Sequence, residues 1–147
     1  MLYFAYGSNL NHHQMKKRCK GSKYIKKYTL NGYKLIFSHK TKDTIYGHAN
    51  IIKNKNSRVF GAIWDINKKD ESELDGYEGV DYDYYQKEYF YLRGKKVLVY
   101  VQQVYFPKKP NSTYLHTIID GYKDCNINVS LLKKTISKYD IDYKISW

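Results

Sequence analysis

The chain has 147 residues, the size of one ordinary folded domain, and its 42% apolar and 17% aromatic content excludes a disordered chain. Its formal net charge of +12 permits a polyanionic partner, but nearly all the basic residues are scattered lysines, so charge alone assigns no function. The two cysteines, Cys19 and Cys125, lack the spacing of a disulfide scaffold or a zinc site, so we expect reduced thiols.

The N-terminal segment is short, apolar and aromatic. Leu2 to Tyr6 is followed by Gly7, a pattern that favours a buried strand ending in a turn. The opening MLYFAYGSNL has no basic leader and no small-residue cleavage site, so we expect neither a signal peptide nor a membrane span, and a cytoplasmic protein. Asn11 can then cap a helix from His12 to Cys19.

The middle of the chain predicts mostly β-strands, because apolar β-branched and aromatic residues recur between short polar links. The links Asn54–Ser57 and Arg93–Lys95 are typical of connections between antiparallel neighbours, and Phe90–Val101 is expected to form a hairpin. The predicted strands are Tyr28–Phe37, Ala49–Ile52, Arg58–Ile66, Tyr85–Leu92 and Val97–Tyr105.

Further helices are expected between and after these strands. They are Lys68–Tyr77 capped by Asn67, a short helix over Tyr114–Gly121, and Val129–Tyr139 capped by Asn128. Many strands with few, separated helices predict an α+β fold in which a mixed or antiparallel sheet curls into a small β-barrel with flanking α-helices. We expect residues 1–147 to form a single domain.

The first candidate site is the run Tyr6-Gly7-Ser8-Asn9-Leu10. A turn between a buried strand and a helix start gathers unpaired backbone N–H groups, and a glycine lets a ligand approach them. Local chemistry alone leaves another interpretation open, in which Ser8 and Asn9 simply help to cap the following helix.

The second candidate site is Leu74-Asp75-Gly76-Tyr77-Glu78-Gly79-Val80, where a helix gives way to a loop. A carboxylate partly desolvated among tyrosines has a pKa that rises toward neutrality, as a proton-transfer catalyst requires. A solvated acidic helix end is the competing interpretation, and the residues alone do not choose among the nearby carboxylates, which are Glu71, Glu73, Asp75, Glu78 and Asp81.

Taken together, the two motifs resemble the γ-glutamylcyclotransferase family and its plant-type relatives. YGSNL follows the first strand, and LDGYEGV follows a strand of the type VFGAIWDI. The resemblance continues through GYKLIF, GHANI, VLVYVQQVYF and PNSTYLHTIIDGY, which together cover nearly the whole chain. It implies a small mixed β-barrel and an enzyme that closes a γ-glutamyl amide on itself to give 5-oxoproline and a free amine or amino acid.

Residue by residue, the resemblance implies that the loop Tyr6, Gly7, Ser8, Asn9 and Leu10 binds the γ-glutamyl group and that Glu78 transfers protons. It further implies that Tyr85, Tyr100 and Tyr114 line the substrate pocket. No metal or cofactor is expected, because the substrate's own α-amino group attacks its γ-amide carbonyl. The expected partner is a small-molecule γ-glutamyl substrate, with no specific nucleic acid, no membrane, and a monomeric or homodimeric state.

The sequence leaves the leaving group open among an α-amino acid, the ε-amine of lysine, as in γ-glutamylamine cyclotransferases, and an antibiotic-type amine. Two other hypotheses stand beside the enzyme. One is a non-catalytic basic module whose lysines and tyrosines bind nucleic acid, although the chain has no RNP-like motif. The other is a catalytically inert member of the same family.

Overall fold

The computed structural model describes residues 1–147 and contains six strands, four α-helices and two short 3₁₀ helices. The strands are β1 (Leu2–Ala5), β2 (Lys23–His39), β3 (His48–Asp65), β4 (Gln86–Leu92), β5 (Lys95–Val101) and β6 (Phe106–Pro107). The helices are α1 (His12–Arg18), α2 (Lys68–Tyr77), α3 (Ser112–Asp124) and α4 (Ser130–Ile136), with 3₁₀ turns η1 (Ser8–Leu10) and η2 (Val80–Tyr82).

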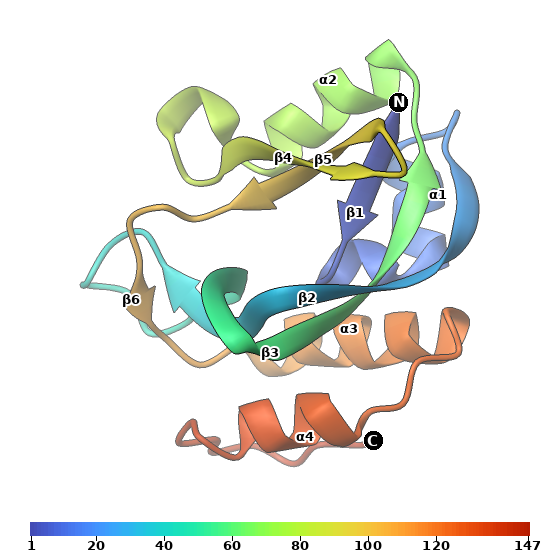
Figure 1. Ribbon diagram of the computed structural model, residues 1–147. Coiled ribbons are helices and arrows are strands. Elements are labelled where there is room, and N and C mark those ends of the chain that lie inside the picture. Colours follow the sequence, from blue (N-terminus) through green and yellow to red (C-terminus); the bar gives the residue numbers. More distant parts are fainter.

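All six strands belong to one sheet in the order β4-β5-β1-β3-β2-β6. Neighbouring strands are antiparallel except β1 and β5, which run parallel. The sheet curls into a half-barrel, with α2 beside the β4–β5 hairpin and with α3 and α4 beside β2 and β3 (Figure 1). This confirms the predicted α+β fold with a curled mixed sheet and flanking helices.

The prediction of two strands joined by a link at Asn54–Ser57 was wrong, because β3 is a single strand. The chain stays in one strand, and Lys53 and Arg58 pair with Tyr33 and Asn31 of β2, so the four intervening residues bulge out of the ladder opposite a single residue. The polar composition of this segment therefore marks a β-bulge and not a turn between strands. We call Asn54–Ser57 the β3 bulge.

The hairpin between β4 and β5 is confirmed. Its turn residues Arg93 and Gly94 have positive φ angles of 50° and 79°, the left-handed pair that a two-residue hairpin turn requires. Strand β5 ends at Val101 and does not continue to Tyr105 as expected, since the chain then crosses over and Phe106–Pro107 pairs with the far edge of β2.

The caps predicted for α1 and α2 are also confirmed. Asn11 Oδ1 accepts a hydrogen bond of 3.0 Å from the Gln14 N–H, and Asn67 Oδ1 accepts one of 2.8 Å from the Asp70 N–H. The Asp70 side chain in turn accepts from the Asn67 N–H, completing a capping box.

The last two helices differ from the prediction in length. Helix α3 spans Ser112–Asp124, longer than expected, because Asn111 caps it by accepting from the Tyr114 N–H at 2.8 Å. Helix α4 begins at Ser130, whose N–H donates to Asn128, and stops at Ile136. Tyr139 lies beyond the helix, where its hydroxyl accepts from the N–H of Phe37 at 2.7 Å and donates to the carbonyl of that residue at 3.0 Å.

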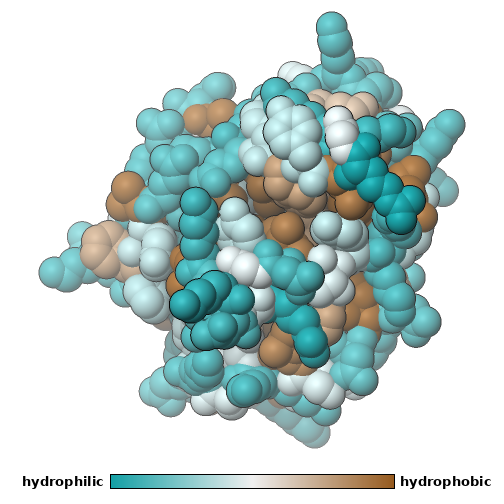
Figure 2. Space-filling model, in the orientation of Figure 1, coloured by the Kyte–Doolittle hydropathy of each residue, from teal (hydrophilic) through white to brown (hydrophobic).

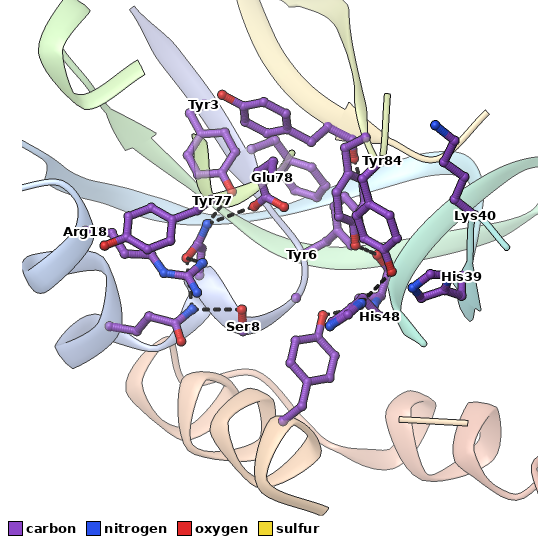
Figure 3. Close-up of a pocket in the computed structure, with 18 of the residues that line it drawn as sticks. Tyr3, Tyr6, Ser8, Arg18, His39, Lys40, His48, Tyr77, Glu78 and Tyr84 are labelled. Atoms are coloured by element: carbon purple, nitrogen blue, oxygen red, sulfur yellow. Dashed lines mark hydrogen bonds between the residues drawn. The ribbon is translucent and has the colours of Figure 1, made fainter. Parts of the chain in front are cut away.

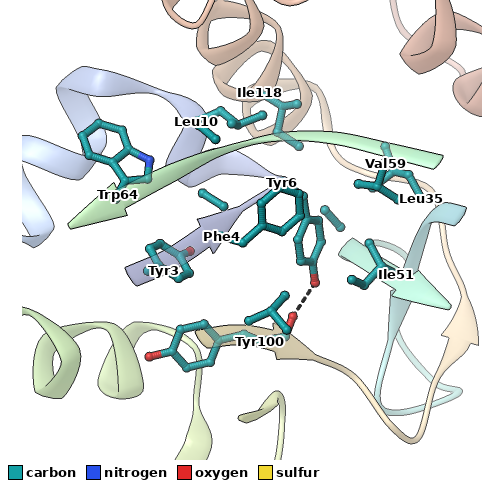
Figure 4. Close-up of a cluster of buried hydrophobic side chains, with 14 of the residues drawn as sticks. Tyr3, Phe4, Tyr6, Leu10, Leu35, Ile51, Val59, Trp64, Tyr100 and Ile118 are labelled. Atoms are coloured by element: carbon teal, nitrogen blue, oxygen red, sulfur yellow. Dashed lines mark hydrogen bonds between the residues drawn. The ribbon is translucent and has the colours of Figure 1, made fainter. Parts of the chain in front are cut away.

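The core is a cluster of 31 buried residues between the sheet and the helices. Figure 4 shows Tyr3, Phe4 and Tyr6 of the first strand segment at its centre and Leu10 beside Ile118 of α3. Gly121 permits this approach of α3 to the η1 turn, since a Cβ there would lie 2.7 Å from the Leu10 side chain.

One face of the molecule is mostly hydrophilic. Figure 2 shows hydrophilic side chains covering and projecting from most of the visible face, with hydrophobic residues exposed mainly in the recesses between them. None of the helices combines the length and the apolar character that crossing a bilayer demands.

Candidate active site

A cavity of about 570 Å³ opens where β1 ends and the η1 turn begins. It has the size of a small-molecule binding site. The two motifs singled out in the sequence meet here, because the lining includes Tyr6, Gly7, Ser8 and Asn9 together with Glu78. Figure 3 shows Glu78 between Arg18 and Tyr77 on one side and Tyr84, His48, His39 and Lys40 on the other.

The floor of the cavity is the turn at Gly7. Within the turn the Leu10 N–H donates to the Gly7 carbonyl at 3.1 Å and the Asn11 N–H donates to the Ser8 carbonyl at 3.0 Å, whereas the N–H of Gly7 donates to no protein group. A Cβ at Gly7 would lie 2.9 Å from the Cβ of Ala49, closer than side chains pack. Glycine is therefore required by the close approach of β3.

Glu78 is placed by the end of α2. It is the residue that follows the helix, and Gly79 turns the chain immediately afterwards with a left-handed φ of 65°. The chain then folds back, so that the Tyr85 N–H donates to the Glu78 carbonyl at 3.2 Å. This reversal brings Tyr84 and Tyr85 to the same cavity as the carboxylate.

The carboxyl group of Glu78 lies in a sparsely solvated environment. Its Oε1 accepts a hydrogen bond of 3.4 Å from the Asn9 amide, and burial raises its pKa from 4.5 to about 7, against the opposing effect of the Arg18 charge. A carboxyl group with a pKa near neutrality can both accept and release a proton under physiological conditions.

The structure also separates Glu78 from the other carboxylates of the motif. Glu71 and Asp75 accept hydrogen bonds from Lys87 at 2.6 Å and 3.1 Å, outside the cavity lining. Among the residues that line the cavity, Glu78 is the only carboxylate. The ambiguity that the sequence left among neighbouring acids is thus removed by the tertiary structure.

One side of the cavity is organised around Asn9. Its Oδ1 accepts from Gln14 Nε2 at 3.0 Å and from Arg18 at 3.2 Å, while its Nδ2 donates to the Tyr3 hydroxyl at 3.0 Å as well as to Glu78. Asn9 is 3% exposed and both polar atoms of its side chain are hydrogen-bonded, so it orients its neighbours and does not cap α1.

Sequence reasoning missed Arg18 as a residue of the site. Its guanidinium lies 4.3 Å from the centroid of the Tyr77 ring and lines the cavity beside Gln14, four positions earlier on the same face of α1. Ser8 is tied to the same face, since its hydroxyl accepts from Gln14 Nε2 at 2.8 Å. The helical spacing of Gln14 and Arg18 directly after the YGSNL turn was the signal that could have identified them.

The four tyrosines singled out in the sequence all line the cavity, and the hydroxyl of each is hydrogen-bonded. Tyr6 donates to the Tyr100 carbonyl at 2.6 Å, and the Tyr100 hydroxyl donates to Asp75 at 2.8 Å. Tyr85 donates to the carbonyl of Ala49, whereas the Tyr114 hydroxyl accepts from the N–H of Ala49 at 2.9 Å. The hydrogen of the Tyr114 hydroxyl is thus left without a protein acceptor.

The other side of the cavity contains two histidines that the sequence did not assign. His48 Nδ1 is hydrogen-bonded to the Tyr84 hydroxyl, and its ring packs at right angles to Tyr114 with centroids 4.9 Å apart. Burial lowers the pKa of His48, and the neighbouring charges of His39 and Arg18 lower it further. Lys40 closes this side by donating to the Tyr82 carbonyl at 2.6 Å.

Several noted residues lie outside the cavity. The side chain of Leu10 is fully buried in the core and does not line the cavity, unlike the rest of its motif. Cys19 and Cys125 are free and buried, as expected, and burial raises the pKa of each thiol to about 12. No group of three or more histidine, cysteine or acidic side chains is placed to hold a metal ion.

The chain is similar to known proteins over most of its length. Residues 3–122 match the family described as gamma-glutamyl cyclotransferase, AIG2-like. Over 152 residues the chain is 31% identical to gamma-glutamylcyclotransferase of Bos taurus, covering 97% of this chain and 81% of the bovine one. It is 28% identical to gamma-glutamylcyclotransferase of Homo sapiens over 151 residues, covering 97% and 80% of the two chains.

Solved structures agree with the sequence comparison. A structure named gamma-glutamyl cyclotransferase superposes with a TM-score of 0.80 at 27% identity, covering 99% of this chain and 92% of that one. A human protein described only as uncharacterized superposes with a TM-score of 0.81 at 28% identity, covering 99% and 91%. Both motifs of the cavity lie within the matched residues.

Proposed function

Because the chain belongs to the gamma-glutamylcyclotransferase family, we propose that it converts a γ-glutamyl amino acid into 5-oxoproline and the free amino acid. The observation that carries this proposal is that Glu78, the only carboxylate lining the cavity, has a pKa of about 7 and faces the turn at Gly7. In the reaction the substrate's α-amino nitrogen forms a bond to the γ-carbonyl carbon, and the original amide C–N bond breaks.

Glu78 serves as the proton carrier in this scheme. It accepts a proton from the substrate's α-ammonium, which frees the nitrogen for attack, and it returns a proton to the departing nitrogen. A positioned acid–base group of this kind accelerates a reaction by about 10²–10⁴. The pKa of about 7 supports both steps at one site, since the two protonation states are then similar in free energy.

We assign recognition of the glutamyl α-carboxylate to Arg18. Its guanidinium is hydrogen-bonded to Asn9 at 3.2 Å and stacked over Tyr77, and it lies on the Tyr77 side of Glu78 (Figure 3). A carboxylate held there leaves the adjacent α-ammonium near Glu78. Of the turn amides, the Leu10 N–H is already bonded inside the turn, whereas the N–H groups of Gly7, Ser8 and Asn9 donate to no protein group and can bind other parts of the glutamyl group. For the α-carboxylate, Arg18 supplies a full charge and a fork of donors.

The turn then has another role in the proposal. The Gly7 N–H and the Tyr114 hydroxyl hydrogen both lack protein acceptors, and the Tyr114 oxygen lies 3.4 Å from the position of a Cβ on Gly7. Two adjacent donors of this kind can stabilise the oxyanion that forms when nitrogen attacks the γ-carbonyl. The leaving amino acid would then lie toward Tyr84 and His48.

The proposal is tested by measuring which γ-glutamyl compounds the protein converts. Purified protein would be offered γ-glutamyl-alanine, γ-glutamyl-ε-lysine and glutathione separately, with 5-oxoproline measured by mass spectrometry. We expect product from γ-glutamyl-alanine, at a rate lower by about 10²–10⁴ when Glu78→Gln replaces the wild type. Product only from γ-glutamyl-ε-lysine would replace the amino-acid assignment with an amine one, and absence of product from all three would reject the cyclisation itself.

A further inference from the structure

A second concave surface is separate from the cavity that contains Glu78. It is a groove of about 510 Å³ between β2, the β3 bulge and α4, and it shares no residue with the active-site cavity. Its lining contains five basic side chains and no acidic one. These basic residues are Lys34, Lys55, Arg58, Lys134 and Lys138, and we call them the basic groove.

The fold itself gathers these charges. The β3 bulge carries Lys55 out of the ladder, and Arg58 resumes pairing opposite Asn31, on the strand that also holds Lys34. On the other wall, Lys134 of α4 and Lys138 in the turn that follows this helix both line the groove. Basic residues from three separate segments thus line one groove. The sequence did not indicate this grouping, because these residues are far apart along the chain.

The charges of the groove are not neutralised within the protein. The salt bridges of the structure join Met1, Lys87 and Lys109 to acidic partners, and none involves a residue of the basic groove. The ammonium of Lys34 beside Lys138 lowers the pKa of the Lys138 side chain, a sign of like charges held close together. A bound anion would relieve this repulsion.

The rest of the lining limits the kind of anion. The groove contains no aromatic side chain on which a base could stack, and its remaining residues are asparagines, a serine, a threonine and leucines. Four of the five cations are lysines, which bind phosphate oxygens as point charges, and the fifth is an arginine that can bind them with two donors. We propose that the basic groove binds a small multivalent phosphate anion, of the tripolyphosphate class.

This ligand class fits the observations better than a nucleic acid does. Several positive charges around one concave space match several negative charges on one compact molecule, whereas a duplex needs contacts along an extended surface. The site is independent of the cyclisation reaction and accounts for part of the net charge of +12, which that reaction does not use.

Calorimetric titration of the full chain at about 0.15 M ionic strength tests the proposal, with inorganic tripolyphosphate, ATP and orthophosphate as probes. We expect tripolyphosphate to bind more tightly than orthophosphate. Binding of ATP as tightly as tripolyphosphate would identify a triphosphate group as sufficient, and weaker ATP binding would identify the free inorganic chain. In ¹⁵N NMR spectra, the amides of Lys34, Lys55–Arg58 and Lys134–Lys138 should shift on titration.

Two variants that lose the same number of positive charges at different places distinguish binding at the basic groove from general charge attraction. The triple variant Lys34→Gln, Lys55→Gln, Lys138→Gln should lose at least about tenfold in tripolyphosphate affinity. Arg58 is kept because its guanidinium also lies over the Phe60 ring, 5.3 Å from the centroid. The control variant Lys16→Gln, Lys20→Gln, Lys68→Gln removes the same charge from exposed positions outside the groove and should bind like the wild type.

Three results would overturn the proposal. The first is no tripolyphosphate binding by the wild type, and the second is an equal loss in both triple variants. The third is a 20-base-pair DNA duplex that binds more tightly than tripolyphosphate and depends on the same lysines. We expect the groove variant to produce 5-oxoproline at the wild-type rate. If phosphate binding is not observed, the proposed cyclisation reaction is therefore unaffected.

Discussion

The side-chain amide of Asn9 donates a hydrogen bond to the carboxylate of Glu78 over 3.4 Å, although the two residues are 69 positions apart. The same amide group is held at its oxygen by Gln14 and Arg18. Asn9 therefore connects Glu78, the proposed proton-transfer group, with Arg18 and the turn at Gly7. The roles proposed for these residues lead to separate experiments.

Glu78→Gln should leave the fold intact and lower kcat by about 10²–10⁴, because the amide has nearly the same shape but cannot carry a proton. Substrate should still bind. Single-turnover measurements of 5-oxoproline together with calorimetric binding of a γ-glutamyl substrate would check both statements. Turnover within a few-fold of the wild type would remove Glu78 from the proton-transfer role.

The raised pKa of Glu78 also makes a prediction about stability. Burial raises the pKa from 4.5 to about 7, so between these values the folded state binds more protons than the unfolded state. Stability contributed by this group is present below about pH 4.5 and is lost as the pH rises toward 7, by at most about 3 kcal/mol. Urea unfolding of Glu78→Gln at several pH values should lack this decline. Parallel pH dependence in both proteins would contradict it.

Replacing Arg18 should affect binding and titration together. Arg18→Gln removes the charge that opposes the raised pKa of Glu78, so the acidic limb of the pH profile for kcat/KM should move to higher pH. Loss of the partner for the substrate carboxylate should raise KM by about tenfold or more. Arg18→Lys keeps the charge and should preserve the position of the limb, while only partly preserving KM. An unchanged pH profile in Arg18→Gln would exclude the electrostatic link.

Gly7→Ala should impair substrate binding and stability, because its Cβ would lie 2.9 Å from the Cβ of Ala49 and one of the two segments must move. Gly76→Ala is a matched control. A Cβ at Gly76 has no neighbour within 4 Å, and the residue lies in α2, so alanine should stabilise the protein by about 0.5–1 kcal/mol with no effect on KM. Thermal unfolding and steady-state kinetics distinguish the two substitutions. Wild-type KM in Gly7→Ala would argue against contact between the turn and substrate.

Tyr114→Phe tests the proposed oxyanion donor. Removal of one such donor costs about 10²–10³ in kcat, whereas loss of a merely structural tyrosine hydroxyl lowers stability instead. Tyr139→Phe provides the comparison, since its hydroxyl bonds to the backbone of Phe37 and lies outside the active-site cavity. We expect Tyr139→Phe to lower the melting temperature at unchanged kcat. Equal kcat in Tyr114→Phe and the wild type would exclude the Tyr114 hydroxyl as the second oxyanion donor beside the Gly7 N–H.

Much of the fold could be predicted because local patterns act over short distances. The caps by Asn11 and Asn67 and the turn at Arg93–Gly94 depend on residues a few positions apart, and the structure confirms them. The prediction was wrong at Asn54–Ser57, where a polar run forms a bulge and not a turn between strands. Composition does not separate these cases, because strand pairing with β2 decides between them.

By itself the sequence determined the class of fold and the two motifs that meet at the candidate active site, since strand, turn and helix signals are local. Only the tertiary structure decided which carboxylate faces the turn, because Lys87 pairs with Glu71 and Asp75 while Glu78 remains in the cavity. It likewise added Arg18 and His48 to the site and collected the basic groove. Such groupings depend on contacts between distant segments, and burial and charge acquire their effect on chemistry only when those contacts form.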